Sequence, residues 1–122
     1  MRISTSLSLL SLLALLPACG PTTREDAQDQ ATNSACDFYE ECEEIGSGDG
    51  KEFQDRKECE VKARDFFQGA WTANNCPAIN EKGLETCLER IRTTSCSSGT
   101  DFFNTAFIVC GSGSVCQEEA QD

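Results

Sequence analysis

The stretch CEVKARDFFQGA, residues 59–70, decides the fold of this chain. Its apolar side chains fall at i, i+4, i+7, i+8 and i+11 and belong to Cys59, Ala63, Phe66, Phe67 and Ala70. This spacing places them along one side of an α-helix, whereas a half-buried strand would alternate apolar and polar residues. We therefore predict a helix over residues 52–70 that buries this stripe. Its opposite face is expected to stay in water with four basic side chains, Arg56, Lys57, Lys62 and Arg64.

The same periodicity recurs further along the chain. Leu84, Cys87, Leu88 and Ile91 follow i, i+3, i+4 and i+7, and so do Phe103, Ala106, Phe107 and Cys110. These patterns predict a helix over residues 79–93 and another that Thr100 caps and Gly111 ends. An earlier helix is predicted over residues 34–45, with Ser34 as its cap and the glycine-rich run 46–50 after it. The expected fold is all-α, a small disulfide-rich bundle of three to four short helices.

The N-terminus has the pattern of an export signal. Arg2 supplies a positive charge, residues 3–16 form an apolar run, and the tetrapeptide LPAC at residues 16–19 closes it. A helix of that length reaches about 21 Å, less than the roughly 30 Å of a bilayer's hydrocarbon core. We therefore predict a cleaved export signal at the N-terminus. Cleavage after Ala18 by the ordinary secretory signal peptidase fits the sequence less well, because Leu16 stands where that reaction needs a small residue.

Cysteine usage predicts a disulfide-bonded domain. The chain has nine cysteines, of which Cys19 belongs to the signal tetrapeptide. The other eight can form four disulfides in the oxidising compartment that an exported protein reaches. They are Cys36, Cys42, Cys59, Cys76, Cys87, Cys96, Cys110 and Cys116. Spacing leaves their connectivity open, since eight cysteines allow roughly a hundred pairings.

Metal binding and thiol-redox chemistry are the alternative uses of these cysteines. Structural zinc sites and thioredoxin-like centres need a Cys-x-x-Cys pair, which this chain lacks. It also has no histidine, which removes His-ligated metals and Ser-His or Cys-His nucleophiles. A calcium loop threaded from Glu41 to Glu52 places Ile45 where an oxygen ligand is required. We expect neither a metal nor a cofactor.

Composition divides the exported part of the chain into three segments. Residues 20–34 contain alanine as their only apolar type, so we predict a flexible polar tether over residues 19–34, starting at Cys19. The disulfide-rich helical domain covers residues 35–117, and residues 118–122 form an acidic tail.

Within the domain, Trp71 is expected in the core rather than in a ligand groove. The glycine-rich run 111–114 lies between two cysteines, so we predict a disulfide-closed turn there and not a phosphate-binding loop.

Four segments together resemble small cysteine-rich bacterial lipoproteins of uncharacterised function. They are LPAC at 16–19, CDFYEEC at 36–42, WTANNC at 71–76 and CGSGSVC at 110–116. The first resembles a lipobox, which implies a lipoprotein signal peptide over residues 1–18 that is cleaved before Cys19. It also implies acylation of Cys19 and stable anchoring by its fatty chains. Gly20, where an inner-membrane retention signal has aspartate, implies the outer membrane. The resemblance implies an envelope location and a fold type, and no activity.

Charge narrows the set of partners. The formal net charge is −11, which repels phosphate backbones, so no nucleic-acid partner is expected. The acids concentrate over residues 37–44 and in the tail, which favours a basic protein partner at the first helix and the loop after it.

Three function classes remain open. We favour a non-enzymatic envelope module for interaction or structure; the others are an effector or inhibitor with a rigid loop such as residues 46–51, and a hydrolase with paired carboxylates.

Overall fold

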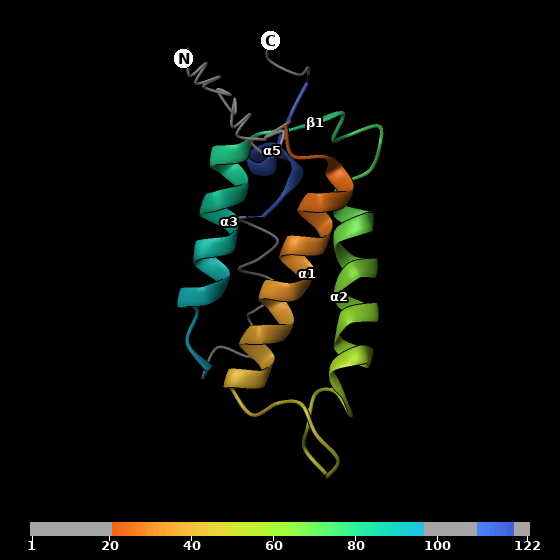
Figure 1. Cartoon of the computed structure of the whole chain (residues 1–122), viewed down its shortest axis with the longest axis vertical. Helices are drawn as coiled ribbons and strands as arrows, with labels where there is room; N and C mark the ends of the chain where they lie inside the picture. The colour runs from red at the N-terminus through yellow and green to blue at the C-terminus, as the bar shows by residue number, and fades with distance from the viewer. Residues whose placement is uncertain (1–20, 97–109, 119–122) are drawn as a thin grey trace, which may run out of the picture.

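The computed structural model of the chain describes residues 21–96 and 110–118 (Figure 1). The elements follow in the order α1 (Arg24–Glu41), α2 (Arg56–Ala70), β1 (Ala78–Ile79), α3 (Glu81–Thr93), α5 (Ser112–Val115) and β2 (Cys116–Gln117). The three long helices lie along the long axis of the molecule, and α1 contacts both α2 and α3. The all-α prediction is confirmed, because the two strands have only two residues each.

α1 shows that the prediction of a flexible tether over residues 19–34 is wrong for residues 24–34. The helix begins at Arg24 and not at Ser34, because the Thr23 hydroxyl accepts a hydrogen bond from the Asp26 backbone N–H at 3.1 Å. Ala27, Ala31 and Ala35 recur at every fourth position and are buried. Small side chains on one helix face let neighbouring helices approach closely, so these alanines are buried together with Gln28 and Thr32 although the segment has no large apolar residue.

The ends of α1 and α2 also differ from the prediction. α1 ends at Glu41, so residues 42–45 are not helical. α2 begins at Arg56, where the Asp55 side chain accepts a hydrogen bond from the Glu58 backbone N–H at 2.8 Å. The expected start at residue 52 is too early, because Phe53 leaves the helix path and is buried in the core.

α3 is shorter than predicted by its first two residues. Asn80 caps it by accepting a hydrogen bond from the Gly83 backbone N–H at 3.1 Å. Ile79, expected inside the helix, lies in β1 and pairs antiparallel with Cys116 of β2. The helix predicted to start at Thr100 lies outside the described residues, apart from its last residue, Cys110.

The core lies where the three long helices meet. α2 contributes Cys59, Ala63 and Phe67 to it, while Phe66 and Ala70 are partly buried at its edge. Trp71 follows α2 and is fully buried, as predicted. Its indole N–H donates a hydrogen bond to the Cys110 carbonyl oxygen at 2.7 Å, which satisfies the only polar atom of this side chain.

The eight cysteines of the domain form four disulfides, the number that the sequence predicts. The pairs are Cys36–Cys59, Cys42–Cys96, Cys76–Cys116 and Cys87–Cys110. The disulfide-closed turn predicted at residues 111–114 is wrong, because its flanking cysteines bond to other parts of the chain instead of to each other. Residues 112–115 form the one-turn helix α5.

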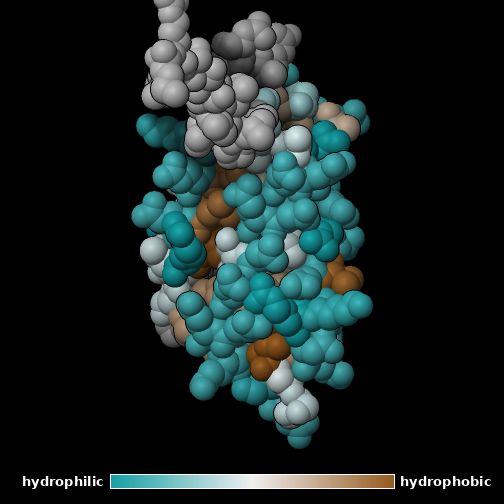
Figure 2. All heavy atoms as spheres, viewed as in Figure 1, coloured by the Kyte–Doolittle hydropathy of each residue, from teal (hydrophilic) through white to brown (hydrophobic). Residues whose placement is uncertain are grey.

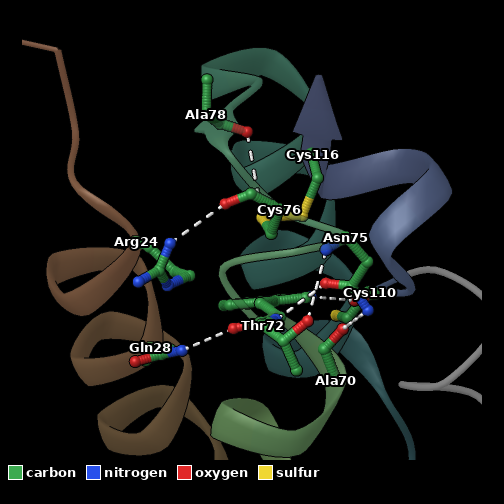
Figure 3. Close-up of a disulfide and its surroundings, with 10 residues drawn as sticks. Arg24, Gln28, Ala70, Thr72, Asn75, Cys76, Ala78, Cys110 and Cys116 are labelled. Atoms are coloured by element: carbon green, nitrogen blue, oxygen red, sulfur yellow. Dashed lines mark hydrogen bonds between the residues drawn. A yellow bond between two sulfur atoms is a disulfide. The ribbon is translucent and has the colours of Figure 1, made fainter. Parts of the chain in front are cut away.

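Hydrogen bonds hold the first turns of α1 against the segment that follows α2 (Figure 3). Arg24 Nη1 donates to the Cys76 carbonyl oxygen at 3.3 Å, and Gln28 Nε2 donates to the Trp71 carbonyl oxygen at 2.9 Å. Gln28 is buried, so its amide replaces water as the partner of that carbonyl. The start of α1 is therefore part of the folded domain.

Candidate functional site

The acidic run of the sequence lies at one end of the bundle. α1 ends at Glu41, and the chain turns back into α2 at this end, whereas the start of α1 and the β1 segment lie at the opposite end (Figure 1). We call residues 37–55 the acidic end. Its carboxylates are Asp37, Glu40, Glu41, Glu43, Glu44, Asp49, Glu52 and Asp55, and Lys51 is its only basic residue. The structure thus gathers these charges on one pole of the molecule.

Backbone hydrogen bonds order the loop within the acidic end. The Gly46 N–H donates to the Phe53 carbonyl oxygen at 3.0 Å, and the Phe53 N–H donates to the Glu44 carbonyl oxygen at 3.1 Å. The Lys51 ammonium donates to the carbonyl oxygen of Glu43, which has a left-handed φ of 57°. Residues 47–51 beyond this base are exposed. The loop therefore projects from a fixed base.

An aromatic cluster of Phe38, Tyr39 and Phe53 lies at the base of the loop. The Tyr39 ring lies 5.0 Å from the Phe53 ring and 5.4 Å from the Phe38 ring, both in edge-to-face geometry. Burial raises the pKa of the Tyr39 hydroxyl above its ordinary value, and the charges of Glu52 and Glu44 raise it further. Tyr39 therefore stays neutral at physiological pH and acts in packing rather than in charge binding.

Arg56 joins α1 to α2 at the acidic end. Its Nη1 lies 2.7 Å from Asp37 Oδ1 and 3.1 Å from Glu40 Oε2, and its Nε lies 2.9 Å from Glu60 Oε1. The hydrogen bond with Asp37, followed by that with Glu60, raises the pKa of the guanidinium further above its usual range. One cation thus holds three carboxylates that would otherwise repel each other.

A second arginine of α2 makes the same kind of contact nearer the other end. Arg64 Nη2 lies 2.9 Å from Asp29 Oδ1 of α1. The prediction that the basic face of this helix stays fully in water is therefore wrong for Arg56 and Arg64. Both are partly buried against α1: Arg56 meets Asp37 and Glu40 in the part of this helix that the sequence predicted, whereas Arg64 meets Asp29 in the upstream part that it did not.

A groove of about 320 Å³ lies between α1 and α3. Its apolar lining residues are Leu84 and Leu88, and Figure 2 shows apolar atoms in the furrow between these two helices. Two carboxylates also line it, Glu81 and Glu85. The backbone N–H and the hydroxyl of Thr22 both donate to Glu81 Oε1, at 3.2 and 3.1 Å. Glu81 therefore joins the segment before α1 to the start of α3.

A second, wider groove lies beside α5 and β2. Its lining side chains are mostly uncharged: Asn74, Asn75, Pro77, Ser112, Cys116 and Gln117, together with Gly113 and Glu118. Asn75 is already used inside the fold, since its Nδ2 donates to the Ala70 carbonyl oxygen at 3.1 Å and its Oδ1 accepts from the Thr72 N–H at 2.7 Å (Figure 3). This groove is thus a mostly uncharged surface formed by the turn after α2 together with α5 and β2.

Two further predicted features concern metals and the membrane. Within residues 21–96 and 110–118, no three Cys, Asp or Glu side chains come together to hold a metal ion. No helix in that part of the chain is long and apolar enough to cross a bilayer. Cys19 lies outside the described residues, so its acylation stays a prediction, as do the signal peptide before it and the remainder of the acidic tail.

One protein-family model matches residues 36–118 of the chain, and its description is a family of unknown function, DUF6184. The matched region begins at Cys36, inside α1, and contains the eight paired cysteines and the acidic end. The first turns of α1 therefore extend the domain upstream of the matched region. No curated protein and no solved structure matches the chain. With the family match covering most of its length, the chain belongs to DUF6184.

Proposed function

We propose that this protein is a lipid-anchored lipoprotein of the bacterial envelope whose disulfide-bonded domain is a non-enzymatic interaction module. The lipobox-like tetrapeptide and the count of nine cysteines, eight of them paired, support an acylated Cys19. The acidic end is the surface that would meet a partner. The observation that supports this proposal best is the start of α1 at Arg24, because an acylated Cys19 would then lie only a few residues before the helix whose other end carries the acidic end.

The distance from anchor to helix is short. Only residues 20–23 separate Cys19 from α1, and a fully extended chain covers about 3.5 Å per residue, so this connection spans roughly 15 Å at most. α1 then runs for 18 residues, which is about 27 Å of helix. An acylated Cys19 would hold the start of α1 near the bilayer and direct the acidic end away from it.

Electrostatics supports the same orientation. Anionic lipid headgroups produce a negative surface potential, which falls off within a Debye length of about 8–10 Å. The exposed carboxylates of the acidic end would be repelled by that surface, so the orientation in which they point away from the bilayer has the lower free energy. In this orientation the acidic end is free to meet a protein whose contact face is basic.

The anchor is tested by replacing Cys19. The Cys19→Ala variant should lose labelling by radioactive palmitate and leave the membrane fraction, while Trp71 stays buried and the eight other cysteines stay oxidised. Both properties can be read from tryptophan fluorescence and from thiol titration under denaturing conditions without reductant. Persistent labelling, or membrane retention of the variant, would contradict the anchor.

The partner surface is tested by charge reversal at matched positions. Glu41→Lys and Asp49→Lys change the acidic end at exposed residues, whereas Asp65→Lys and Glu118→Lys make the same charge change elsewhere. Crosslinking in intact envelopes should lose its partner with the first pair and keep it with the second. Raising the salt concentration should slow association more than it speeds dissociation. Equal effects of the two pairs would show that the charge serves solubility alone.

The ordered loop favours a second candidate, an effector or inhibitor that binds another protein. An exposed loop on a fixed base loses little conformational entropy on binding, and residues 47–51 above the Gly46–Phe53 hydrogen bond have this arrangement. The two candidates differ in what binding does. The soluble Cys19→Ala protein should suppress the activity of a captured partner if it is an inhibitor, and should leave that activity unchanged if it is an interaction module.

A further inference from the structure

We propose that the Cys42–Cys96 disulfide is a thiol–disulfide exchange site, at which a dithiol reductant releases the far end of α3 from α1 while the other three disulfides keep the domain folded. This inference requires neither the lipid anchor nor a basic partner. It rests on how exposed each disulfide is and on what connects each pair of helices.

Exposure separates this disulfide from the other three. Cys36, Cys59, Cys76 and Cys87 are 0 % exposed and Cys110 is 2 % exposed. Cys116 is partly buried, but its partner Cys76 lies in the core. Cys96 is exposed and Cys42 is only partly buried. Exchange requires that a thiolate reach one sulfur while the other leaves as a thiolate, and burial disfavours a leaving thiolate. Cys42–Cys96 is the pair that meets both requirements.

The connections of α1 to its two neighbours differ in kind. On the α2 side, the buried Cys36–Cys59 disulfide and the ion pairs of Arg56 and Arg64 cross the interface. On the α3 side, the polar connections that the structure describes lie at the two ends, Thr22 with Glu81 at one and Cys42–Cys96 at the other. The groove lined by Leu84 and Leu88 lies on this side. Cleavage of Cys42–Cys96 would therefore remove the covalent closure of this interface.

The chemical step uses two electrons and two protons from the dithiol. Its first sulfur, as a thiolate, attacks Cys96 Sγ, the Cys42–Cys96 bond breaks, and Cys42 leaves as a thiolate that takes up a proton. The second sulfur of the dithiol then attacks the first, which breaks the mixed disulfide and releases Cys96 as a thiol. The dithiol is oxidised to a disulfide, and both cysteines of the protein are reduced.

The remaining contacts limit how far α3 moves. Its middle stays joined through Cys87–Cys110, and the Asn80 N–H before it donates to the Val115 carbonyl oxygen at 2.7 Å. Its last turns, after Leu88, keep no covalent tie to α1. Since Cys42 directly follows α1, the same cleavage also removes a covalent restraint beside the base of the acidic end, while the backbone hydrogen bonds of that base remain. Reduction would thus change the surface at the pole that carries the exposed loop.

The first test measures the order in which the disulfides open. The full chain, purified in detergent, is treated with increasing dithiothreitol, alkylated, digested and analysed by mass spectrometry. Cys42 and Cys96 should be alkylated at a dithiothreitol concentration about tenfold lower than the other six cysteines. Simultaneous opening of all four disulfides, or earlier opening of Cys76–Cys116, would overturn the proposal.

The second test measures what the cleavage changes. In the Cys42→Ser/Cys96→Ser variant, amide hydrogen exchange in the last turns of α3 should accelerate about tenfold or more, while the rates in α2 stay the same. The matched variant Cys76→Ser/Cys116→Ser should affect β1 and β2 instead. Unchanged exchange in α3, or equal acceleration in α2, would overturn the proposal. Should either variant fail to fold, the reduction order in the unmodified protein decides.

Discussion

Gly83 in the first turn of α3 packs directly against the backbone of Ser114 in α5. A Cβ atom added at Gly83 would lie 1.8 Å from the Ser114 carbonyl oxygen and 2.9 Å from its carbonyl carbon. Backbone atoms cannot move aside as a flexible side chain does. This contact lets the Asn80 N–H reach the Val115 carbonyl oxygen, and it joins α3 to the C-terminal segment.

Gly83→Ala should therefore destabilise the domain, although alanine is the better helix former. We expect a loss of about 1–3 kcal/mol in the free energy of unfolding, because the two backbone segments must separate. Gly69→Ala is the matched control in α2, where an added Cβ meets nothing within 4 Å, and it should raise stability by up to about 1 kcal/mol. Urea unfolding with intact disulfides, followed by Trp71 fluorescence, measures both. A neutral Gly83→Ala would contradict the contact.

Arg56→Ala should lower stability in a salt-dependent way. The arginine side chain is 32 % exposed and its partners Asp37 and Glu40 are 63 % and 47 % exposed, so water screens the ion pairs and we expect a loss of about 1 kcal/mol at low salt. Arg56→Lys keeps the charge but loses the planar, forked hydrogen-bonding geometry of the guanidinium. Its stability should therefore lie between that of the unmodified protein and that of the Arg56→Ala variant. The loss should shrink in concentrated salt, as measured by urea unfolding at two salt concentrations. A loss that salt does not change would assign Arg56 a packing role instead.

Thr23→Ala should destabilise the domain by about 1 kcal/mol, since it removes the cap of α1. Thr23→Ser keeps the hydroxyl and is expected to retain most of the stability. Hydrogen exchange should show the loss in the first turns of α1, around Ala27. A flexible tether would have no cap to lose, so an unaffected Thr23→Ala variant would restore the prediction that composition suggested.

The parts of the fold that follow from local patterns were predictable. The apolar stripe through Cys59, Ala63 and Phe67 located α2, and the even number of cysteines left after Cys19 indicated four disulfides. The start of α1 was missed because alanines among polar residues indicate disorder by composition. Their burial depends on α2 and α3 lying close enough to cover such small side chains, which is a tertiary property.

Of the candidate site, the sequence predicted the cluster of acidic residues but not the contacts between helices that position it. The run at residues 37–44 identified the acidic end, and the i,i+4 spacing of Arg56 and Glu60 is readable as a helical ion pair. The contact of Arg56 with Asp37 joins two helices, so it required the packing of α1 on α2. Disulfide pairing likewise depends on which helices are neighbours, and the assignment of Cys42 to Cys96 has no signal in their spacing.

Tyr39 predicts how the domain responds to alkaline pH. The ordinary tyrosine pKa is about 10, and burial together with Glu52 and Glu44 raises the Tyr39 pKa in the folded state. Below pH 10 the hydroxyl is neutral in both the folded and the unfolded chain, so stability does not depend on it. Above pH 10 the unfolded chain releases this proton and the folded one retains it. Stability should then fall by up to about 1.4 kcal/mol per pH unit.

The measurement is simple because Tyr39 is the only tyrosine of the chain. Tyrosinate absorbance in an alkaline titration should appear together with the change in Trp71 fluorescence that marks unfolding. Tyr39→Phe removes the proton that the unfolded chain would release, so its stability should decline less steeply above pH 10 than that of the unmodified protein. The slopes are compared rather than the absolute stabilities, because loss of the hydroxyl also affects packing. Tyrosinate forming near pH 10 in the folded protein would show that the acidic end leaves Tyr39 open to water.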